Sequence, residues 1–233
     1  MYRIFPAKSF AYLIALLAVG VFLAIELATE AFGIEIRILA IPGFVWILLL
    51  GLTFNPIWRW VWARSKAIPL LPDLNDKVFP DLNGEWEMLL ESNWSRQEQL
   101  LDAAGDRRKS FDPRTCGSDD LAPLKPMTLK AEIEQSWWSI KMTVTNPAAN
   151  SPIKESNTYI VMPRKRTENT PPSLCYFYDQ TNDTDNQADD PVFSAAACLT
   201  YQLKDDTLKG TFWTARQWRR AINTAGKITL TRK

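Results

Sequence analysis

The sequence offers few groups for catalysis. It contains no histidine, which removes the commonest general base, Ser-His triads and nearly every zinc arrangement. It also lacks a Gly-rich phosphate loop and any metal-ligand spacing, and its carboxylates alternate outward along predicted strands instead of converging. We therefore expect a protein that is not an enzyme, with no catalytic residue, metal or cofactor.

Residues suited to ligand binding gather instead at one end of the predicted strands. There the inward positions change from apolar side chains to hydroxyls, aromatic rings and an arginine. Such groups can hydrogen-bond base edges, stack on bases and hold a phosphate. Core filling is the alternative for inward aromatics such as Trp138 and Tyr201, and a wet turn is the alternative for Arg216 with residues 218–220. The candidate ligand-binding residues are Ser92, Trp94, Thr158, Tyr178, Tyr201, Thr214 and Arg216.

The first predicted strand shows how these residues are positioned. Its period-two alternation marks one buried and one wet face. Asn83-Gly84 supplies the turn before it, and Gly84-x-Trp86 resembles the start of lipocalin-like barrels, where the tryptophan plugs the closed end. The inward face carries Trp86, Met88, Leu90, Ser92 and Trp94.

Similar alternation predicts eight antiparallel strands, which can close a barrel without an exposed edge. The later strands are expected at 127–134, 138–145, 157–164, 173–179, 193–203, 208–216 and 227–232, with one short helix at 97–104. Long connections follow strands one, three, five and seven, so we predict an up-and-down barrel whose long loops gather at one mouth. The anchor would attach under the closed end, and the mouth would face the cytosol.

One connection is rich in aspartate and invites comparison with a cation site. Its spacing lacks the glycine and the terminal glutamate of an EF-hand, so a solvated loop is the favoured interpretation. The residues concerned are Asp179, Asp183, Asp185, Asp189 and Asp190.

Two apolar runs precede the barrel. Residues 10–25 form an unbroken run of sixteen, and residues 38–54 form a second run of seventeen that Asn55-Pro56 ends. The second run argues against a signal peptide. The short acidic connection between the runs requires a hairpin. We expect transmembrane helices at about 8–28 and 37–55.

Charge bias predicts the orientation of this hairpin. Arg3 and Lys8 precede it and basic residues follow it, whereas the connecting turn is mainly acidic, so both termini should be cytoplasmic. Trp58, Trp60 and Trp62 predict an interfacial belt at the cytoplasmic exit. The flanking and connecting charges are Arg59, Arg64 and Lys66 after the hairpin, and Glu26, Glu30, Glu35 and Arg37 within the turn.

Charge and cysteine content narrow the possible partners. Six of the 27 basic and three of the 26 acidic residues lie before Ala67, which leaves 21 basic against 23 acidic side chains in the remainder. This near-neutral part disfavours polymeric nucleic acid but allows a small anionic ligand. Cys116, Cys175 and Cys198 are odd in number and widely spaced, which favours a reducing compartment.

These observations divide the chain into three parts. Residues 1–66 form the predicted transmembrane hairpin with its exit segment, residues 67–80 a Pro-punctuated linker, and residues 81–233 the barrel. The isolated barrel has enough apolar residues for its own core.

The whole chain resembles the two-transmembrane β-barrel effectors of bacterial cyclic-oligonucleotide-based anti-phage signalling systems (CBASS). The likeness rests on the helix hairpin after Arg3 and Lys8, the Trp/Arg exit segment, Asp81-Leu-Asn-Gly-Glu-Trp and Glu91-Ser-Asn-Trp. It implies a barrel that senses a cyclic dinucleotide made by a partner nucleotidyltransferase. It further implies homo-oligomerisation, disruption of the bacterial inner membrane and death of the infected cell.

Two other classes remain open. A membrane-tethered, lipocalin-like barrel carrying an apolar ligand would have an apolar mouth, and a structural subunit of a membrane complex would have a fully packed barrel. Neither would bind a cyclic dinucleotide.

Overall fold

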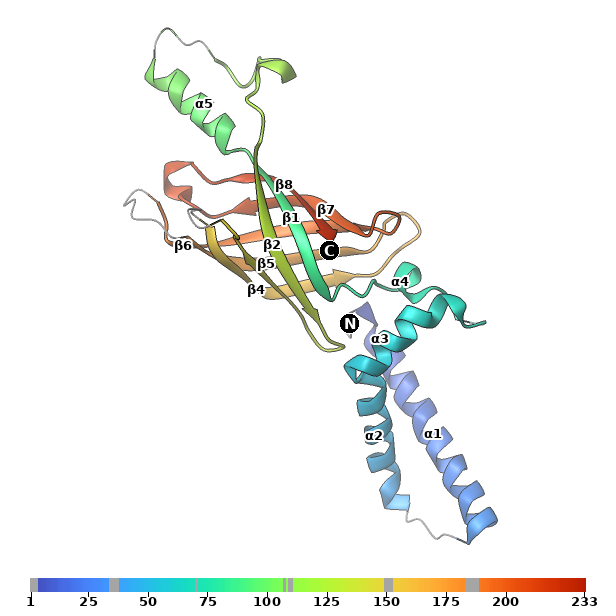
Figure 1. Ribbon diagram of the computed structural model, residues 1–233. Coiled ribbons are helices and arrows are strands. Elements are labelled where there is room, and N and C mark those ends of the chain that lie inside the picture. Colours follow the sequence, from blue (N-terminus) through green and yellow to red (C-terminus); the bar gives the residue numbers. More distant parts are fainter. Residues whose placement is uncertain are drawn as a thin grey trace. The chain divides into compact units, whose positions relative to one another are not determined.

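The computed structural model describes residues 4–33, 38–69, 71–106, 108, 111–148, 153–182 and 189–233. They divide into two compact units, one made of residues 1–81 with 136–139 and the other of residues 82–135 with 140–233. Figure 1 labels the elements of both. Arg3, Glu35, Arg37, Asp183 and Asp185, on which parts of the sequence interpretation rest, lie outside the described residues.

The first unit begins with α1 (Ala7–Phe32), an apolar helix of 26 residues. At ~1.5 Å per residue it is long enough to cross a ~30 Å hydrocarbon layer, and it is the one continuous helix in the described chain that passes this test. The helical turn η2 (Ile38–Ala40) leads into α2 (Ile41–Thr53), which lies beside α1 (Figure 1).

The predicted second span is less complete than the first. α2 has 13 residues, about 20 Å of helix, and ends before Asn55-Pro56 as expected. The chain then bends by 59° into α3 (Asn55–Arg64) and η3 (Ser65–Ala67). A straight helix over 37–55 is therefore not what the structure has, because proline in the first turn of α3 favours a new helix start.

The tryptophans of α3 do not form one exposed belt. Trp58 and Trp62 are 1% and 6% exposed, and their rings meet edge to face at 5.6 Å. Only Trp60 of the three stays exposed, with the guanidinium of Arg64 4.8 Å from its ring centre. The helix therefore turns two indoles into the core of its unit, where Trp62 also meets Trp137.

The segment expected to be a plain linker folds against α3. Asp73 caps α4 (Leu74–Lys77) by accepting hydrogen bonds from the backbone of Asn75 and Asp76. Trp62 Nε1 donates to the carbonyl of Phe79 at 2.9 Å, and Arg59 pairs with Asp81 at 2.8 Å. The segment is thus tied to α3 at several points.

The second unit is a closed barrel in which every strand pairs antiparallel with its chain neighbours and β1 pairs with β8. This confirms the predicted eight-stranded up-and-down order. The strands are β1 (Gly84–Ser92), β2 (Lys125–Gln135), β3 (Ile140–Thr145), β4 (Ile153–Arg164), β5 (Ser173–Asn182), β6 (Val192–Gln202), β7 (Thr207–Thr214) and β8 (Ala225–Arg232).

Several predicted strand ends are wrong. The strand expected at 208–216 ends at Thr214 in β7, so Arg216 lies beyond it. Trp94 does not extend β1 but begins helix α5 (Trp94–Gly105), because the backbone turns at Asn93 and the Trp94 amide bonds to the Ser92 hydroxyl. Trp138 does not face inward from β3. It lies in the turn before that strand and is 55% exposed. The remaining short helices of this unit are η4 (Ser118–Asp120) and η5 (Trp218–Arg220).

The inward faces fill the barrel as the alternation predicts. Along β1, Trp86, Met88 and Leu90 are buried, and along β7 Leu208, Phe212 and Thr214 are buried while Lys209, Thr211 and Trp213 are exposed. Small residues allow the strands to approach closely where the barrel curves. A Cβ on Gly226 of β8 would lie 1.9 Å from the carbonyl oxygen of Glu91 in β1, so only glycine fits there.

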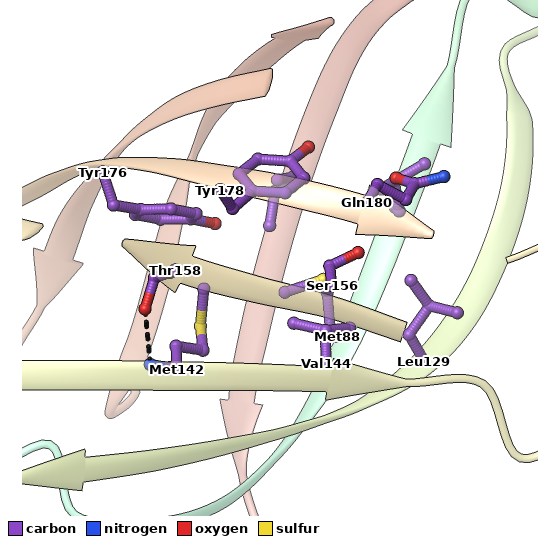
Figure 2. Close-up of a pocket in the computed structure, with 11 residues that line it drawn as sticks. Met88, Leu129, Met142, Val144, Ser156, Thr158, Tyr176, Tyr178 and Gln180 are labelled. Atoms are coloured by element: carbon purple, nitrogen blue, oxygen red, sulfur yellow. Dashed lines mark hydrogen bonds between the residues drawn. The ribbon is translucent and has the colours of Figure 1, made fainter. Parts of the chain in front are cut away.

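One part of the interior is polar. Figure 2 shows Tyr176, Tyr178 and Gln180 along β5, beside Ser156 and Thr158 of β4. A β-bulge between Thr158 and Ile160 shifts the register there, and the Thr158 hydroxyl accepts the backbone N–H of Met142 at 2.8 Å. About 20 Å³ of cavity remains beside these groups, which is room for a water molecule.

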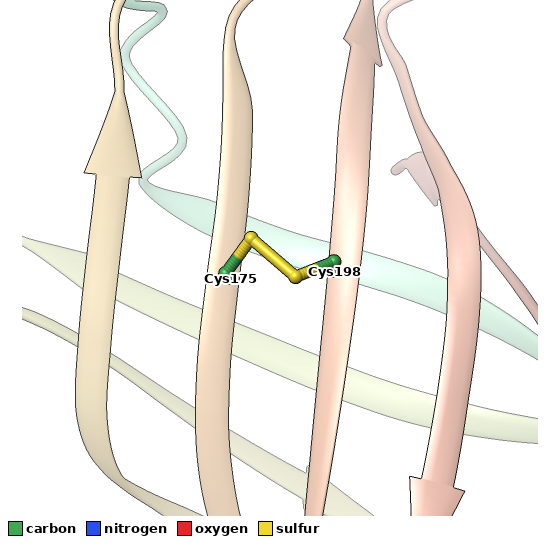
Figure 3. The surroundings of a disulfide bond; sticks show 2 residues. All are labelled: Cys175 and Cys198. Atoms are coloured by element: carbon green, nitrogen blue, oxygen red, sulfur yellow. A yellow bond between two sulfur atoms is a disulfide. The ribbon is translucent and has the colours of Figure 1, made fainter.

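Two of the three cysteines are paired, contrary to expectation. Cys175 of β5 lies directly opposite Cys198 of β6, and their sulfurs form a disulfide (Figure 3). Spacing along the chain did not reveal this, because strand register, not sequence distance, brings the two together. Cys116 is free. The cysteine pattern therefore no longer supports a reducing compartment.

Candidate functional site

The mouth of the barrel holds the strongest candidate site. The ends of β1, β5 and β7 and the starts of β2, β4, β6 and β8 meet there around a cavity of about 200 Å³. Four predicted residues line it, namely Ser92, Trp94, Thr214 and Arg216. The other lining residues are mixed in character: Leu90, Lys125, Met127, Ile153, Gln180, Asn182, Phe193, Phe212 and Thr224.

Arg216 is the charged centre of this mouth. It lies two positions after the last residue of β7, and its guanidinium carbon lies 5.4 Å from the centre of the Trp94 ring. Its Nε and Nη2 donate to the two carboxylate oxygens of Asp189 at 2.7 and 2.6 Å. The arginine is thus held on one edge by a carboxylate and beside an indole, which is a rigid placement for so long a side chain.

The sequence predicts that Asp189 lies in a solvated loop. This prediction is wrong for the Asp189 side chain, which is not solvated. It is only 7% exposed and pairs with Arg216. Burial of the carboxylate acts to raise the pKa of Asp189. The hydrogen bonds and the charge of Arg216 outweigh this effect and hold the pKa of Asp189 below its ordinary value. Asp190 accepts the backbone N–H of Gln217 at 2.6 Å. Within the described part of the chain no acidic cluster could hold a metal ion.

Thr214 is fixed by a polar pair across the mouth. Its hydroxyl lies 3.0 Å from that of Thr224, and the backbone N–H of Thr224 donates to it at 3.1 Å. Ser92 at the end of β1 accepts the N–H of Trp94. These two hydroxyls are therefore partly engaged in shaping the mouth.

Two further predicted residues lie deeper. Thr158 and Tyr178 border the small interior cavity of Figure 2 and not the mouth cavity, and Gln180 borders both. Burial raises the pKa of Tyr178. Burial, with repulsion between the two ionised phenols as the smaller cause, raises the pKa of Tyr176. Both phenols are therefore neutral at physiological pH and can donate hydrogen bonds.

Tyr201 does not belong to this site. Its hydroxyl donates to Asp206 at 2.8 Å, in the turn between β6 and β7. Asp206 also accepts from Arg232, whose guanidinium lies 4.4 Å from the ring of Trp86. Tyr201 is therefore at the closed end, because it lies six positions along β6 from Ala195, which pairs with Thr214.

The turn that follows Arg216 is exposed, as one sequence interpretation allowed. Trp218 is 64% exposed, and the guanidinium of Arg219 lies 5.4 Å from its ring centre. Gln217 and Ala221 on either side have φ of 46° and 56°, a conformation that non-glycine residues rarely adopt. The turn borders an open groove of about 800 Å³ that shares Phe193 with the mouth cavity.

Sequence reasoning missed Lys125, Gln180, Asn182, Phe193, Thr224 and Asp189 at this end. Parity along the strands could have found Phe193. Nothing in the sequence pairs Asp189 with Arg216, because the two lie on different connections.

Comparison with known proteins gives one informative match. No family model matches the chain. The chain is similar to CD-NTase-associated protein 15 of Escherichia albertii, with 30% identity over 161 residues. The match covers 69% of this chain and 66% of that protein, just under two thirds of its length.

Proposed function

We propose that this chain is a membrane-anchored effector of CBASS anti-phage defence whose barrel binds a cyclic dinucleotide. Similarity to a CD-NTase-associated protein supports the link to a partner nucleotidyltransferase that would make the ligand. In this proposal the chain is not an enzyme and needs no cofactor. It acts by binding.

The observation that carries the proposal is the placement of Arg216 against Trp94 at the barrel mouth. A cyclic dinucleotide presents phosphodiesters for a guanidinium and bases for an aromatic face. Ser92, Thr214 and the amide side chains of Gln180 and Asn182 add hydrogen-bonding groups around the same cavity. Thr158 and Tyr178 lie below it and would support the floor of the site.

The size of the cavity suggests how the ligand fits. At about 200 Å³ it is smaller than the roughly 300–1,000 Å³ of ordinary ligand pockets. We infer that one base and its phosphate enter the cavity, while the rest of the ligand lies in the groove beside Trp218. Phe193 lines both spaces and connects them.

The interior argues against the apolar carrier. A lipocalin-like carrier needs an interior that holds its ligand, whereas the cavity beside Tyr176 and Tyr178 leaves about 20 Å³. The mouth is also charged. A binding site at the rim accounts for both features better than a storage cavity.

We further propose that α1 and the bent α2–α3 segment both lie in the bacterial inner membrane, with both termini cytoplasmic. A 13-residue α2 spans with the help of the first turn of α3 and local thinning of the bilayer. Ligand binding would then drive homo-oligomerisation and disruption of the lipid bilayer, and so abortive infection. No polymeric nucleic acid is required.

Calorimetric titration of the full-length chain in detergent tests the proposal. A panel of cyclic dinucleotides, differing in bases and linkage, is compared with duplex DNA and with a fatty acid. We expect binding of at least one cyclic dinucleotide and of neither control. Binding of the fatty acid alone would favour the carrier, and binding of nothing would favour a structural subunit.

A further inference from the structure

The carboxylate of Asp189 is the unexpected group at the barrel mouth. It takes up the Nε–Nη2 edge of Arg216 with two hydrogen bonds, and it is 7% exposed while Arg216 is 22% exposed. Paired carboxylates of this kind usually serve to anchor a structure. Here the arginine also lines a cavity, so its carboxylate partner sets the charge that a ligand meets.

The charges around the cavity are few. Its lining, among the residues described, contains two cations, Lys125 and Arg216, and no carboxylate. Asp189 lies against Arg216 from outside this lining and cancels one of the two positive charges. The mouth therefore carries about one net positive charge. Without Asp189 it would carry about two.

Pairing with Asp189 does not use all the hydrogen-bond donors of Arg216. A guanidinium has five N–H groups, and Asp189 engages one on Nε and one on Nη2. The structure shows no hydrogen-bond partner within its described residues for the Nη1 edge. That edge can donate to a phosphate oxygen while Asp189 stays in place.

We propose that Asp189 is a specificity-determining residue that makes the mouth select phosphodiesters over phosphomonoesters. This inference rests on the proposed function, in that it assumes a phosphorylated ligand at the mouth. A phosphodiester carries one negative charge per phosphate, whereas a monoester carries about 1.5 to 2 at pH 7. Arg216 paired with Asp189 can still donate a hydrogen bond to a phosphodiester, and the nearby carboxylate repels the extra charge of a phosphomonoester.

Selection of phosphodiesters over phosphomonoesters has a clear use in a cell. Mononucleotides and linear nucleotides share bases and ribose with a cyclic dinucleotide, so stacking on Trp94 cannot separate them. The charge on the phosphate group can separate them. Discrimination by an unfavourable contact with the wrong ligand is a common way to achieve specificity.

The test compares two ligands that differ in one bond. A cyclic dinucleotide bound by the full-length chain and its linear, 5′-phosphorylated form have the same bases, but opening the ring turns one diester into a monoester. Affinities of both are measured for wild type and for Asp189→Asn, which keeps the shape of the side chain and removes its charge. We expect the preference for the cyclic form to fall about tenfold in Asp189→Asn, mainly through tighter binding of the linear form.

Matched variants separate this role from simple anchoring. Asp205→Asn removes an exposed carboxylate in the turn between β6 and β7 at the closed end, and it should leave the preference unchanged. Asp189→Glu keeps the charge and should keep most of the preference. If Asp189→Asn does not fold, as judged by thermal unfolding, Asp189→Ser serves as the second neutral variant.

The outcomes distinguish the inference from the proposed function. An unchanged preference in a folded neutral variant, or an equal loss of affinity for both ligands, would overturn the selectivity role. If wild type binds no cyclic dinucleotide, the proposed function fails. The inference is then judged with inorganic pyrophosphate, which should stabilise Asp189→Asn against heat more than wild type; equal shifts would overturn it.

Discussion

At the residue scale, Arg216 carries the proposed ligand contact. A charge-assisted hydrogen bond to phosphate contributes roughly 1.5–3 kcal/mol, so Arg216→Ala should weaken cyclic dinucleotide binding about ten- to a hundredfold. Because the substitution leaves Asp189 unpaired, the double variant Arg216→Ala with Asp189→Ala should show the same loss without an uncompensated carboxylate. Calorimetric titration measures both. Arg164→Ala, an exposed residue at the other end of β4, is the matched control, and an equal loss there would point to a nonspecific charge effect.

Trp86 at the closed end should behave in the opposite way. It is fully buried, its Nε1 donates to the carbonyl of Leu82 at 2.9 Å, and Arg232 lies over its ring. Trp86→Ala should therefore cost roughly 3–5 kcal/mol of stability, as large core deletions do. Denaturant unfolding checks this. Trp213→Ala, on the outer face of β7 and 47% exposed, should cost far less; similar losses would contradict the assigned burial.

At the element scale, alternation along the sequence predicted the barrel well and its ends poorly. A buried and a wet face repeat every two residues, so Trp86, Met88 and Phe212 were placed inward correctly. Trp94 and Trp138 were misplaced, because period-two patterning does not show where a strand stops. At the site, parity placed Ser92 and Thr214 at the mouth. Contacts between separate connections, such as Asp189 with Arg216, leave no periodic trace.

The disulfide between β5 and β6 gives an element-scale prediction. It closes a loop with a sequence separation of 23, for which chain entropy suggests about 3 kcal/mol of stabilisation. Reducing the purified, oxidised protein should lower its melting temperature, and the double variant Cys175→Ala with Cys198→Ala should melt like the reduced wild type. Cys116→Ala is the control. Identical melting of oxidised and reduced protein would show that strand pairing alone fixes this hairpin.

At the scale of the whole molecule, the proposed orientation in the membrane rests on charge alone. Lys8 lies in the first turn of α1, and Arg59, Arg64 and Lys66 follow α2, so positive-inside bias predicts cytoplasmic termini. The cysteine pair is an independent check, since cytosolic thiols stay reduced and periplasmic pairs oxidise. A C-terminal reporter active only in the periplasm should be silent. Because Cys175 is buried, its thiol should be alkylated when protein from freshly lysed cells is unfolded without reductant. An active reporter with a protected cysteine pair would reverse the orientation.

The last prediction concerns the separation of anchor and sensor. The barrel strands pair only with one another around the ring, and the chain divides into its two units next to Asp81. A unit with its own closed sheet and core should fold alone, so residues 82–233 should bind the cyclic dinucleotide with nearly full affinity.

Toxicity, in contrast, should need both units. Cells that produce the isolated barrel together with the nucleotidyltransferase should survive, whereas cells with the full-length chain should lose membrane integrity, measured by dye uptake. The control is the full-length Arg216→Ala variant, which keeps α1 but should bind the ligand weakly and spare the cells. Because the barrel fragment lacks the apolar helix that is long enough to cross a bilayer, its killing of cells would refute a membrane mechanism and would instead require an activity within the barrel itself.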